Sequence, residues 1–193
     1  MKITFDIDLD FGNRDAALEC IKHIPASIIK DGRVTKHNSG VYVTDVPINP
    51  FTGTAAFDYK VAEDRGYFKL DFLNVFVYQQ VKSEEHLIQL MTTEPNWDKL
   101  LDKEFFDKVI HINGHYNEMK KMPEPINSIE RLAMFLALIR PGKKHLVGKT
   151  WKEVAKEIWI KTDDSYSFKK SHSVGYAHLV VVHMNFLTAS LLE

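Results

Sequence analysis

Three aspartates alternate with aliphatic residues near the start of the chain, in the segment Phe5-Asp6-Ile7-Asp8-Leu9-Asp10. Successive side chains of a β-strand point to opposite faces, so a strand here places the three carboxylates on one face and the aliphatic side chains on the other. A row of like charges is unfavourable unless a cation compensates it. The pattern therefore predicts a site for divalent cations.

A further carboxylate, Asp71, lies in a second apolar segment, Phe68-Lys69-Leu70-Asp71-Phe72-Leu73. If this segment pairs with the first strand, Asp71 lies beside that row of aspartates, which gives a carboxylate set that can hold two Mg²⁺ ions, or Mn²⁺, for phosphoryl or nucleotidyl transfer. Lys69 is two residues before Asp71 and so shares its face. Its ammonium group either binds a triphosphate or neutralises a carboxylate, and the sequence leaves both interpretations open.

The elements that position these residues are a small sheet followed by helices. The chain has 193 residues, of which 45% are hydrophobic, so we expect one compact module, residues 1–193. We predict an α+β fold with a small mixed β-sheet in residues 1–80 and a helical part in residues 81–193. Extended segments are expected around residues 41–43, 55–59 and 67–73. The expected helices cover residues 14–23, 83–91, 103–111, 128–140, 151–160 and 171 to the C-terminus.

Three of the expected helices have recognisable N-terminal caps. Asn13 precedes the first helix, and its side chain can accept a hydrogen bond from a free backbone amide. Asn127 has Glu130 three residues on, and Thr150 has Glu153 at the same distance. That spacing is typical of a capping box, so we expect both pairs to begin helices.

The single cysteine, Cys20, permits no internal disulfide, and the N-terminus lacks a basic segment followed by an apolar stretch. We therefore expect a cytoplasmic protein. The apolar run at residues 174–192 approaches membrane-spanning length, but His178, His183 and Asn185 interrupt it. A packed terminal helix is the prediction, with no membrane partner.

The net charge of −1 conceals an uneven distribution. Residues 1–139 contain 16 basic and 21 acidic side chains, whereas residues 140–183 contain 9 basic and 4 acidic ones. A basic stretch after an acidic site is what a phosphate-handling surface requires. A solvated basic face without a ligand explains the same numbers equally well.

Three short segments add polar groups that could contact phosphate. Lys36-His37-Asn38-Ser39-Gly40 offers a cation and an imidazole in what we expect to be a turn before a strand. Arg140-Pro141-Gly142 ends an apolar helix with an arginine at its edge. Lys170-Ser171-His172 opens the last helix, where an anion could bind. Each also has a structural interpretation, as an ordinary loop, a helix end and an N-cap.

Taken in order, five segments resemble the polymerase core of the C family of DNA polymerases, the bacterial DNA polymerase III alpha subunits. Residues 5–11 resemble the family's Pro-Asp-Ile-Asp-x-Asp-Phe, and residues 36–41 its Lys-His-Ala-Ala-Gly-Val. Residues 68–73 resemble its Lys-Met-Asp-Phe-Leu, and residues 137–142 its Ala-Leu-Tyr-Arg-Pro-Gly. Residues 168–177 resemble its Phe-Asn-Lys-Ser-His-Ala...Tyr. The resemblance covers nearly the whole chain and implies a nucleotidyltransferase-like palm.

The resemblance also implies roles for individual residues. Asp6, Asp8 and Asp71 match the catalytic aspartates that hold two Mg²⁺ ions, whereas Asp10 matches a variable position. The resemblance also implies a set of residues that bind the incoming nucleotide or its phosphates. These residues are Lys36, His37, Lys69, Arg140, Lys149, Lys170, Ser171 and His172. Among these, Lys149 is implied only by a weak match of Gly148-Lys149 to a Gly-Lys-Lys of the fingers.

The chain also departs from the family. An alpha subunit exceeds a thousand residues, and its Gly-Ser phosphate-binding turn precedes the Asp-x-Asp strand, whereas this chain begins five residues before Asp6. The interval between Arg140 and Phe168 is shorter than in the family, so the fingers are reduced. These departures lead us to expect a second polypeptide that supplies the missing palm segment.

The function implied is transfer of a dNTP to the 3′-end of a DNA primer-template in a reduced or split polymerase. Retention of all three catalytic aspartates favours chemistry, because unused buried charge is destabilising. A second hypothesis is a non-catalytic DNA-binding or polymerase-interacting protein, either an accessory subunit or a decoy. A third is a metal-dependent nuclease that uses the same carboxylates.

Overall fold

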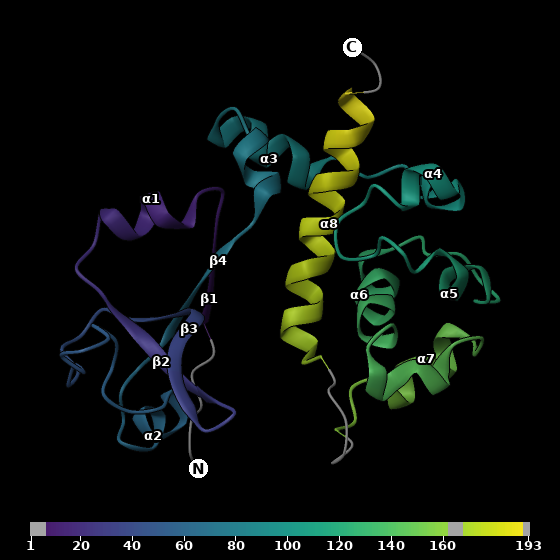
Figure 1. Cartoon of the computed structure of the whole chain (residues 1–193). Helices are drawn as coiled ribbons and strands as arrows, with labels where there is room; N and C mark the ends of the chain where they lie inside the picture. Colours follow the sequence, from purple (N-terminus) through teal and green to yellow (C-terminus); the bar gives the residue numbers. More distant parts are fainter. Residues whose placement is uncertain (1–6, 162–167, 191–193) are drawn as a thin grey trace. The chain divides into compact units, whose positions relative to one another are not determined.

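The computed structural model describes residues 7–161 and 168–190. The chain forms two compact units, residues 1–81 and residues 82–193, and each is described here by itself. Asp6 lies outside the described residues. The first unit combines a sheet with short helices and the second is helical (Figure 1).

The first unit contains a four-stranded mixed sheet, as the sequence predicts. Its strands are β1 (Ile7–Phe11), β2 (Ile24–Lys30), β3 (Arg33–Tyr42) and β4 (Leu70–Asn74), in the order β1-β4-β3-β2. β1 and β4 are parallel, whereas β4 pairs with β3 and β3 with β2 in the antiparallel sense. The two segments that contain the predicted metal ligands are therefore neighbouring strands.

The first helix, α1 (Arg14–Glu19), is shorter than predicted. Asn13 caps it as expected, because its side chain accepts a hydrogen bond from the Ala16 amide at 3.1 Å. The predicted helix to residue 23 is wrong at its C-terminal end, since α1 ends at Glu19 and β2 begins shortly after it, at Ile24. The β-branched and aliphatic residues of this strand pair with β3, and this pairing overrides helical periodicity.

A tight hairpin joins β2 to β3. Lys30 pairs with Arg33, so Asp31 and Gly32 form a two-residue turn with φ angles of 50° and 73°. Left-handed backbone at both positions is characteristic of the turn that matches strand twist, and an Asp-Gly pair favours it.

The predicted turn at Lys36–Gly40 is wrong, because these residues lie inside β3. The strand is irregular at this point. Pro25 pairs with Val41 and Ser27 with Lys36, so one residue of β2 faces four residues of β3. Such an irregularity redirects side chains, and here it brings His37 and Ser39 toward β4.

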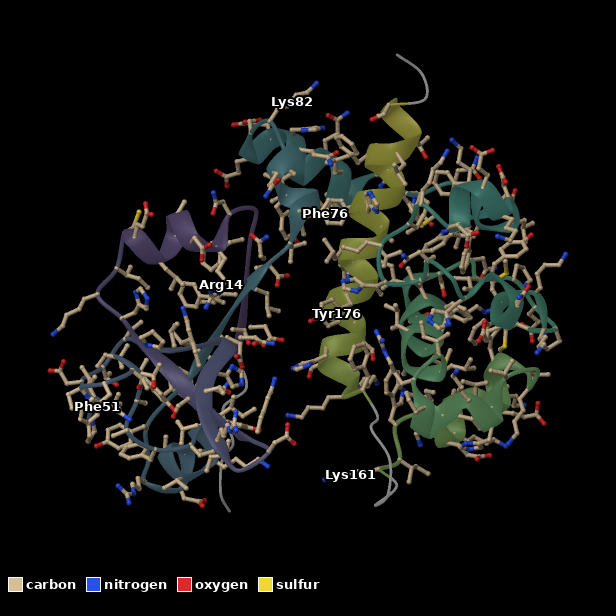
Figure 2. The ribbon with its side chains drawn as sticks, in the orientation of Figure 1. Arg14, Phe51, Phe76, Lys82, Lys161 and Tyr176 are labelled. Atoms are coloured by element: carbon tan, nitrogen blue, oxygen red, sulfur yellow. The ribbon has the colours of Figure 1, made fainter. Side chains whose placement is uncertain are left out.

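The two faces of the sheet have different coverings. α1 packs on one face, where Leu18 contacts Val41 and Phe72 and the ring of Phe11 stacks on Phe72 at 4.8 Å. The Arg14 Nε atom donates a hydrogen bond to the Phe72 carbonyl oxygen at 2.9 Å, which ties α1 to β4 (Figure 2). Alternation then directs Asp8 and Asp71 to the opposite face.

The segment at residues 55–59 is not a strand, contrary to prediction. It makes only two isolated bridges, Ile48 with Ala55 and Ser27 with Asp58, before α2 (Tyr59–Asp64) begins. After β4, the short 3₁₀ helix η1 (Phe76–Gln80) ends the unit.

The second unit is helical, as predicted for this half of the chain. Figure 1 shows α8 beside α6, and these two helices make the most extensive contact in the unit. The elements are α3 (Glu84–Thr92), η2 (Trp97–Leu101), α4 (Lys103–Phe106), α5 (Tyr116–Lys120), α6 (Ile129–Leu138), η3 (Pro141–Leu146), α7 (Trp151–Glu157) and α8 (Lys170–Ser190).

The predicted boundaries in this unit are partly correct. Thr150 and Glu153 form the predicted capping box of α7. The predicted box at Asn127 is wrong, because Ser128 caps α6 by accepting a hydrogen bond from the Arg131 amide. The predicted helix over residues 103–111 ends at Phe106, because the chain then turns to bury Val109 and Ile112 in the core.

Buried polar side chains of α8 bind the C-terminal end of α3 and the segment that follows α4. The amide nitrogen of Asn185 donates to the carbonyl oxygens of Leu90 at 2.9 Å and Thr93 at 2.8 Å. His183 accepts a hydrogen bond from the Ile110 amide at 3.0 Å. The terminal apolar run is thus a packed helix, and no helix among the described residues is both long and apolar enough to cross a membrane.

The long helix α8 contains one glycine, Gly175, that nothing requires. A Cβ atom added there meets no heavy atom within 4 Å, and the backbone is helical. Gly175→Ala should therefore raise the free energy of unfolding by about 0.5–1 kcal/mol, since alanine loses less conformational entropy on folding. Urea denaturation measures the change, and an unchanged or lower midpoint would contradict the prediction.

Candidate functional site

The candidate site lies on the face of the sheet opposite α1 and centres on Asp71. Asp71 pairs in register with Asp8 on one side and with Gly40 on the other. Residues in register on neighbouring parallel strands project to the same face, about 4.8 Å apart at the backbone. The fold therefore brings Asp8 and Asp71 together as the sequence predicts, although they are 63 residues apart in the chain.

Both oxygens of the Asp71 carboxylate are engaged. The Ser39 hydroxyl donates to Oδ1 at 2.7 Å, and the Lys69 ammonium group forms a hydrogen-bonded ion pair with Oδ2. The side chains of Asp71 and Lys69 are only 13% and 19% exposed. This desolvation makes the ion pair stronger than a pair on an open surface.

His37 lies against the same carboxylate but in a neutral form. Its Nδ1 atom accepts hydrogen bonds from the Gly40 amide at 2.9 Å and the Ser39 amide at 3.3 Å. Burial, with the positive charge of Lys69, lowers the pKa of His37. The 3.8 Å approach of Nδ1 to Asp71 Oδ1 is therefore not an ion pair, because the lone pair of Nδ1 already faces the amides.

Gly40 and Tyr59 shape the space that Lys69 occupies. A Cβ atom at position 40 would lie 2.7 Å from Lys69 Cδ and 3.0 Å from His37 Nδ1. Glycine is thus required sterically, although its backbone does not need a positive φ. The Tyr59 ring, at the start of α2, lies 5.7 Å from the Lys69 ammonium nitrogen and packs edge-on against the His37 ring.

Asp10 extends the row of acidic residues along β1. It shares a face with Asp8, and partial desolvation together with the charge of Asp8 raises its pKa. Asp10 in turn contributes to the raised pKa of Tyr78, for which burial is the larger cause. Negative charge therefore accumulates at this end of the face.

The donor chemistry of the face suits a hard divalent cation. Carboxylate oxygens are the preferred protein ligands of Mg²⁺ and Mn²⁺, and Asp8 and Asp71 lie in register on neighbouring strands. Within the described part of the chain, no three acidic, histidine or cysteine side chains form a metal-binding cluster. The third predicted ligand, Asp6, lies outside that part. The site fits a cation on the condition that Lys69 leaves Asp71 Oδ2.

The remaining predicted phosphate ligand of the first unit, Lys36, is exposed and adjoins His37 in β3. The others all belong to the second unit. Arg140 precedes η3, as the proline after it predicts, and its guanidinium carbon lies 4.1 Å from the centre of the Phe168 ring. Its Nε atom is buried without a hydrogen-bond partner among the described residues.

Aromatic and imidazole groups surround Arg140. Phe168 stacks on Tyr176 at 5.7 Å, and the His111 ring lies 4.6 Å from the Tyr176 ring. Burial, the charge of Arg140 and the charge of His183 lower the pKa of His111. Histidine at position 111 has a φ angle of 66°, an uncommon conformation for a residue with a side chain.

Lys170 and Ser171 are exposed in the first turn of α8, and His172 follows them. The helix begins at Lys170, so the alternative interpretation of Ser171 as an N-cap does not hold. Lys149 lies 3.3 Å from Glu157 Oε1 and is partly neutralised by it.

One lysine of the basic stretch belongs to the core. Lys143 is 2% exposed, and its ammonium group donates to the carbonyl oxygens of Glu157 at 2.9 Å and Ile160 at 2.6 Å. The expectation of a basic stretch available to phosphate thus needs correction at this position, because Lys143 caps the end of α7 instead.

Two contributors to the site, Ser39 and Tyr59, were not among the predicted site residues. Ser39 is two residues from His37. If the segment had been predicted as a strand, this spacing would have placed both side chains on the same face. The trio Ser39, His37 and Asp71 is not a nucleophilic triad. Serine donates directly to the aspartate, and the histidine does not bridge them.

Comparison of the chain with protein-family models, with curated proteins and with solved structures gave no match.

Proposed function

We propose that this chain contributes a nucleotidyltransferase-like palm and reduced fingers to metal-dependent transfer of a dNTP onto a DNA 3′-end. The observation that carries the proposal is the placement of Asp8 beside Asp71 on one face of the sheet, next to Lys69. This is the arrangement that the resemblance to C-family polymerases implies. A single face that combines carboxylates with a lysine suits a metal-bound triphosphate.

Individual residues have distinct parts in this proposal. Asp8 and Asp71, with Asp6, are the ligands for divalent cations, which supply charge neutralisation and activation of the primer 3′-hydroxyl when bound. Ser39 fixes the orientation of the Asp71 carboxylate through Oδ1. Neutral His37 offers its Nε2–H as a hydrogen-bond donor, since Nδ1 is occupied by backbone amides.

The second unit contributes positive charge for DNA and for the incoming nucleotide. Arg140, Lys149, Lys170, Ser171 and His172 are the proposed contacts. From the same resemblance we propose that a second polypeptide supplies the phosphate-binding turn of the palm. Backbone amides in such a turn hold the triphosphate in a fixed orientation, which point charges alone do not provide.

The direct test is extension of a labelled primer on a DNA template by the purified chain in Mg²⁺ or Mn²⁺, with EDTA as the control. Template-directed incorporation above the EDTA background supports the proposal, and the signal is expected to be weak without the second polypeptide. Release of mononucleotides from the primer without any incorporation would instead identify a nuclease.

A second candidate function is a non-catalytic DNA-binding or polymerase-interacting protein built on the same unit. Two observations favour it. Each oxygen of the Asp71 carboxylate already has a protein partner, Ser39 or Lys69, as in a purely structural ion pair. Phe51 is 96% exposed on the loop between β3 and α2, where an aromatic side chain can contact a protein partner (Figure 2). Binding of primer-template without incorporation under any metal condition would select this function.

The basic stretch makes a prediction common to the polymerase and to a non-catalytic DNA-binding protein. Duplex DNA should bind with little sequence preference, and affinity should fall steeply between 50 and 200 mM salt, because bound phosphates release counterions. The double variant Lys149→Glu/Lys170→Glu should weaken binding about tenfold or more at low salt. Fluorescence anisotropy measures both effects. Affinity that is independent of salt would contradict the prediction, and Lys22→Glu, a reversal in the first unit, is the control.

A further inference from the structure

The ion pair between Lys69 and Asp71 has a feature that a permanent structural pair does not require. While it is paired with Asp71, the ammonium nitrogen of Lys69 also lies 5.7 Å from the centre of the Tyr59 ring. Its alkyl stem occupies the space that Gly40 leaves empty. Lys69 can therefore withdraw from Asp71 without losing all of its stabilising contacts.

The two oxygens of Asp71 are held in different ways. Oδ1 accepts from Ser39, a neutral hydroxyl on a neighbouring strand that fixes the plane of the carboxylate. Oδ2 is paired with a cation on a flexible side chain. A divalent cation shared with Asp8 requires one Asp71 oxygen. Of the two, Oδ2 is the exchangeable one, because one cation can replace another there without leaving a buried charge uncompensated.

We propose that Lys69 is a resident counter-ion of the site, which holds Asp71 Oδ2 while no divalent cation is bound and withdraws toward Tyr59 when one binds. This inference rests on the proposed metal-dependent function and adds regulation of the same site. The consequence is that occupancy of the metal site and the Lys69–Asp71 ion pair exclude each other. The apparent affinity for a cation is then lowered by the pair that must be broken.

The test compares Mn²⁺ binding by the full chain and its variants at low ionic strength, measured by the electron paramagnetic resonance signal of free Mn²⁺. Lys69→Met should bind Mn²⁺ on the order of tenfold more tightly than the wild type, since both the competing charge and the pair are removed. The matched control is Lys60→Met. Lys60 lies 5.9 Å from the same Tyr59 ring, but Asp71 pairs with Lys69. A gain in Mn²⁺ affinity confined to Lys69→Met assigns the effect to the charge that pairs with Asp71 and not to the loss of any positive charge beside Tyr59.

Thermal unfolding provides a second readout that a merely structural lysine would not produce. Without metal, Lys69→Met should melt below the wild type, because Asp71 loses its counter-ion. In millimolar Mn²⁺ the order should reverse, since the tighter-binding variant gains more from mass action.

The outcomes separate the two proposals. In one outcome, the wild type binds Mn²⁺, Asp8→Asn does not, and Lys69→Met binds no more tightly than the wild type. This result overturns the proposal that Lys69 is a counter-ion and leaves the metal-dependent function intact. If Lys69→Met binds Mn²⁺ and the wild type does not, the counter-ion proposal is supported, and Lys69 excludes the cation completely in the wild type. No binding by either protein refutes the metal site, and with it both proposals.

Discussion

Asp8→Asn is expected to abolish Mn²⁺ binding and to reduce any metal-dependent nucleotide incorporation on the order of 10²–10³-fold, the scale found when one group that stabilises transition-state charge is removed. Asparagine has the size of aspartate but lacks its charge. Because Asp8 faces Asp71 across the β1–β4 pair, its loss removes half of the described carboxylate pair. The metal then no longer has two ligands from adjacent strands.

The Mn²⁺ part of this expectation can be tested without a partner chain. Saturating Mn²⁺, at about 100 times its dissociation constant, should stabilise the wild type by about 2.7 kcal/mol, and this stabilisation should vanish in Asp8→Asn. Primer extension reports incorporation in the same samples. Asp45→Asn is the matched control, because its side chain is 91% exposed and it also removes one carboxylate from the first unit. Equal Mn²⁺ stabilisation of Asp8→Asn and wild type would refute the metal site.

The sequence predicts which carboxylates share a face of each strand, because that signal is local, whereas the pairing of the two strands was a condition of the prediction that the structure meets. Alternation in residues 6–10 fixes which side chains share a face of β1, and the apolar segment around Asp71 resembles a second strand. Pairing of β1 with β4 then places Asp8 opposite Asp71. The hypothesis of a metal site depends only on these two steps.

The sequence is insufficient for the interior of the sheet, where pairing between distant segments decides the structure. Ile24 would fit the apolar face of a longer first helix as well as it fits strand β2. Only the pairing with β3 decides between helix and strand at this residue. The Asp31-Gly32 turn is the local signal that could have identified the hairpin. Without that hairpin, the segment containing His37 and Ser39 resembles a loop.

The roles of the lysines could not be predicted, because they depend on burial. Lys69 was expected either to bind a triphosphate or to neutralise a carboxylate, and the structure shows the ion pair with Asp71. Lys143 was counted with the basic stretch, yet the core of the second unit encloses it. Charge alone, read along a sequence, does not distinguish a ligand-binding lysine from one that satisfies buried carbonyl groups.

That distinction leads to a large expected effect on stability. Lys143→Met should lower the free energy of unfolding by about 3 kcal/mol, because hydrogen bonds from a charged donor contribute about 1.5–3 kcal/mol each and their loss leaves buried carbonyl oxygens unsatisfied. The two carbonyls belong to Glu157 and Ile160, at and just beyond the end of α7. Methionine fills much of the lysine's space, so the loss comes from the donors and not from a cavity.

Lys144→Met provides the control, because this neighbouring residue of η3 has the same charge but is exposed. Its expected change is within about 0.5 kcal/mol. Urea denaturation should show a lower midpoint for Lys143→Met with an unchanged m value. DNA binding by the same two variants gives a separate result. An equal loss of DNA affinity in both would show that the buried Lys143 affects DNA only through its long-range charge. Equal stability of the two variants would show that the buried ammonium group does not hold the end of α7.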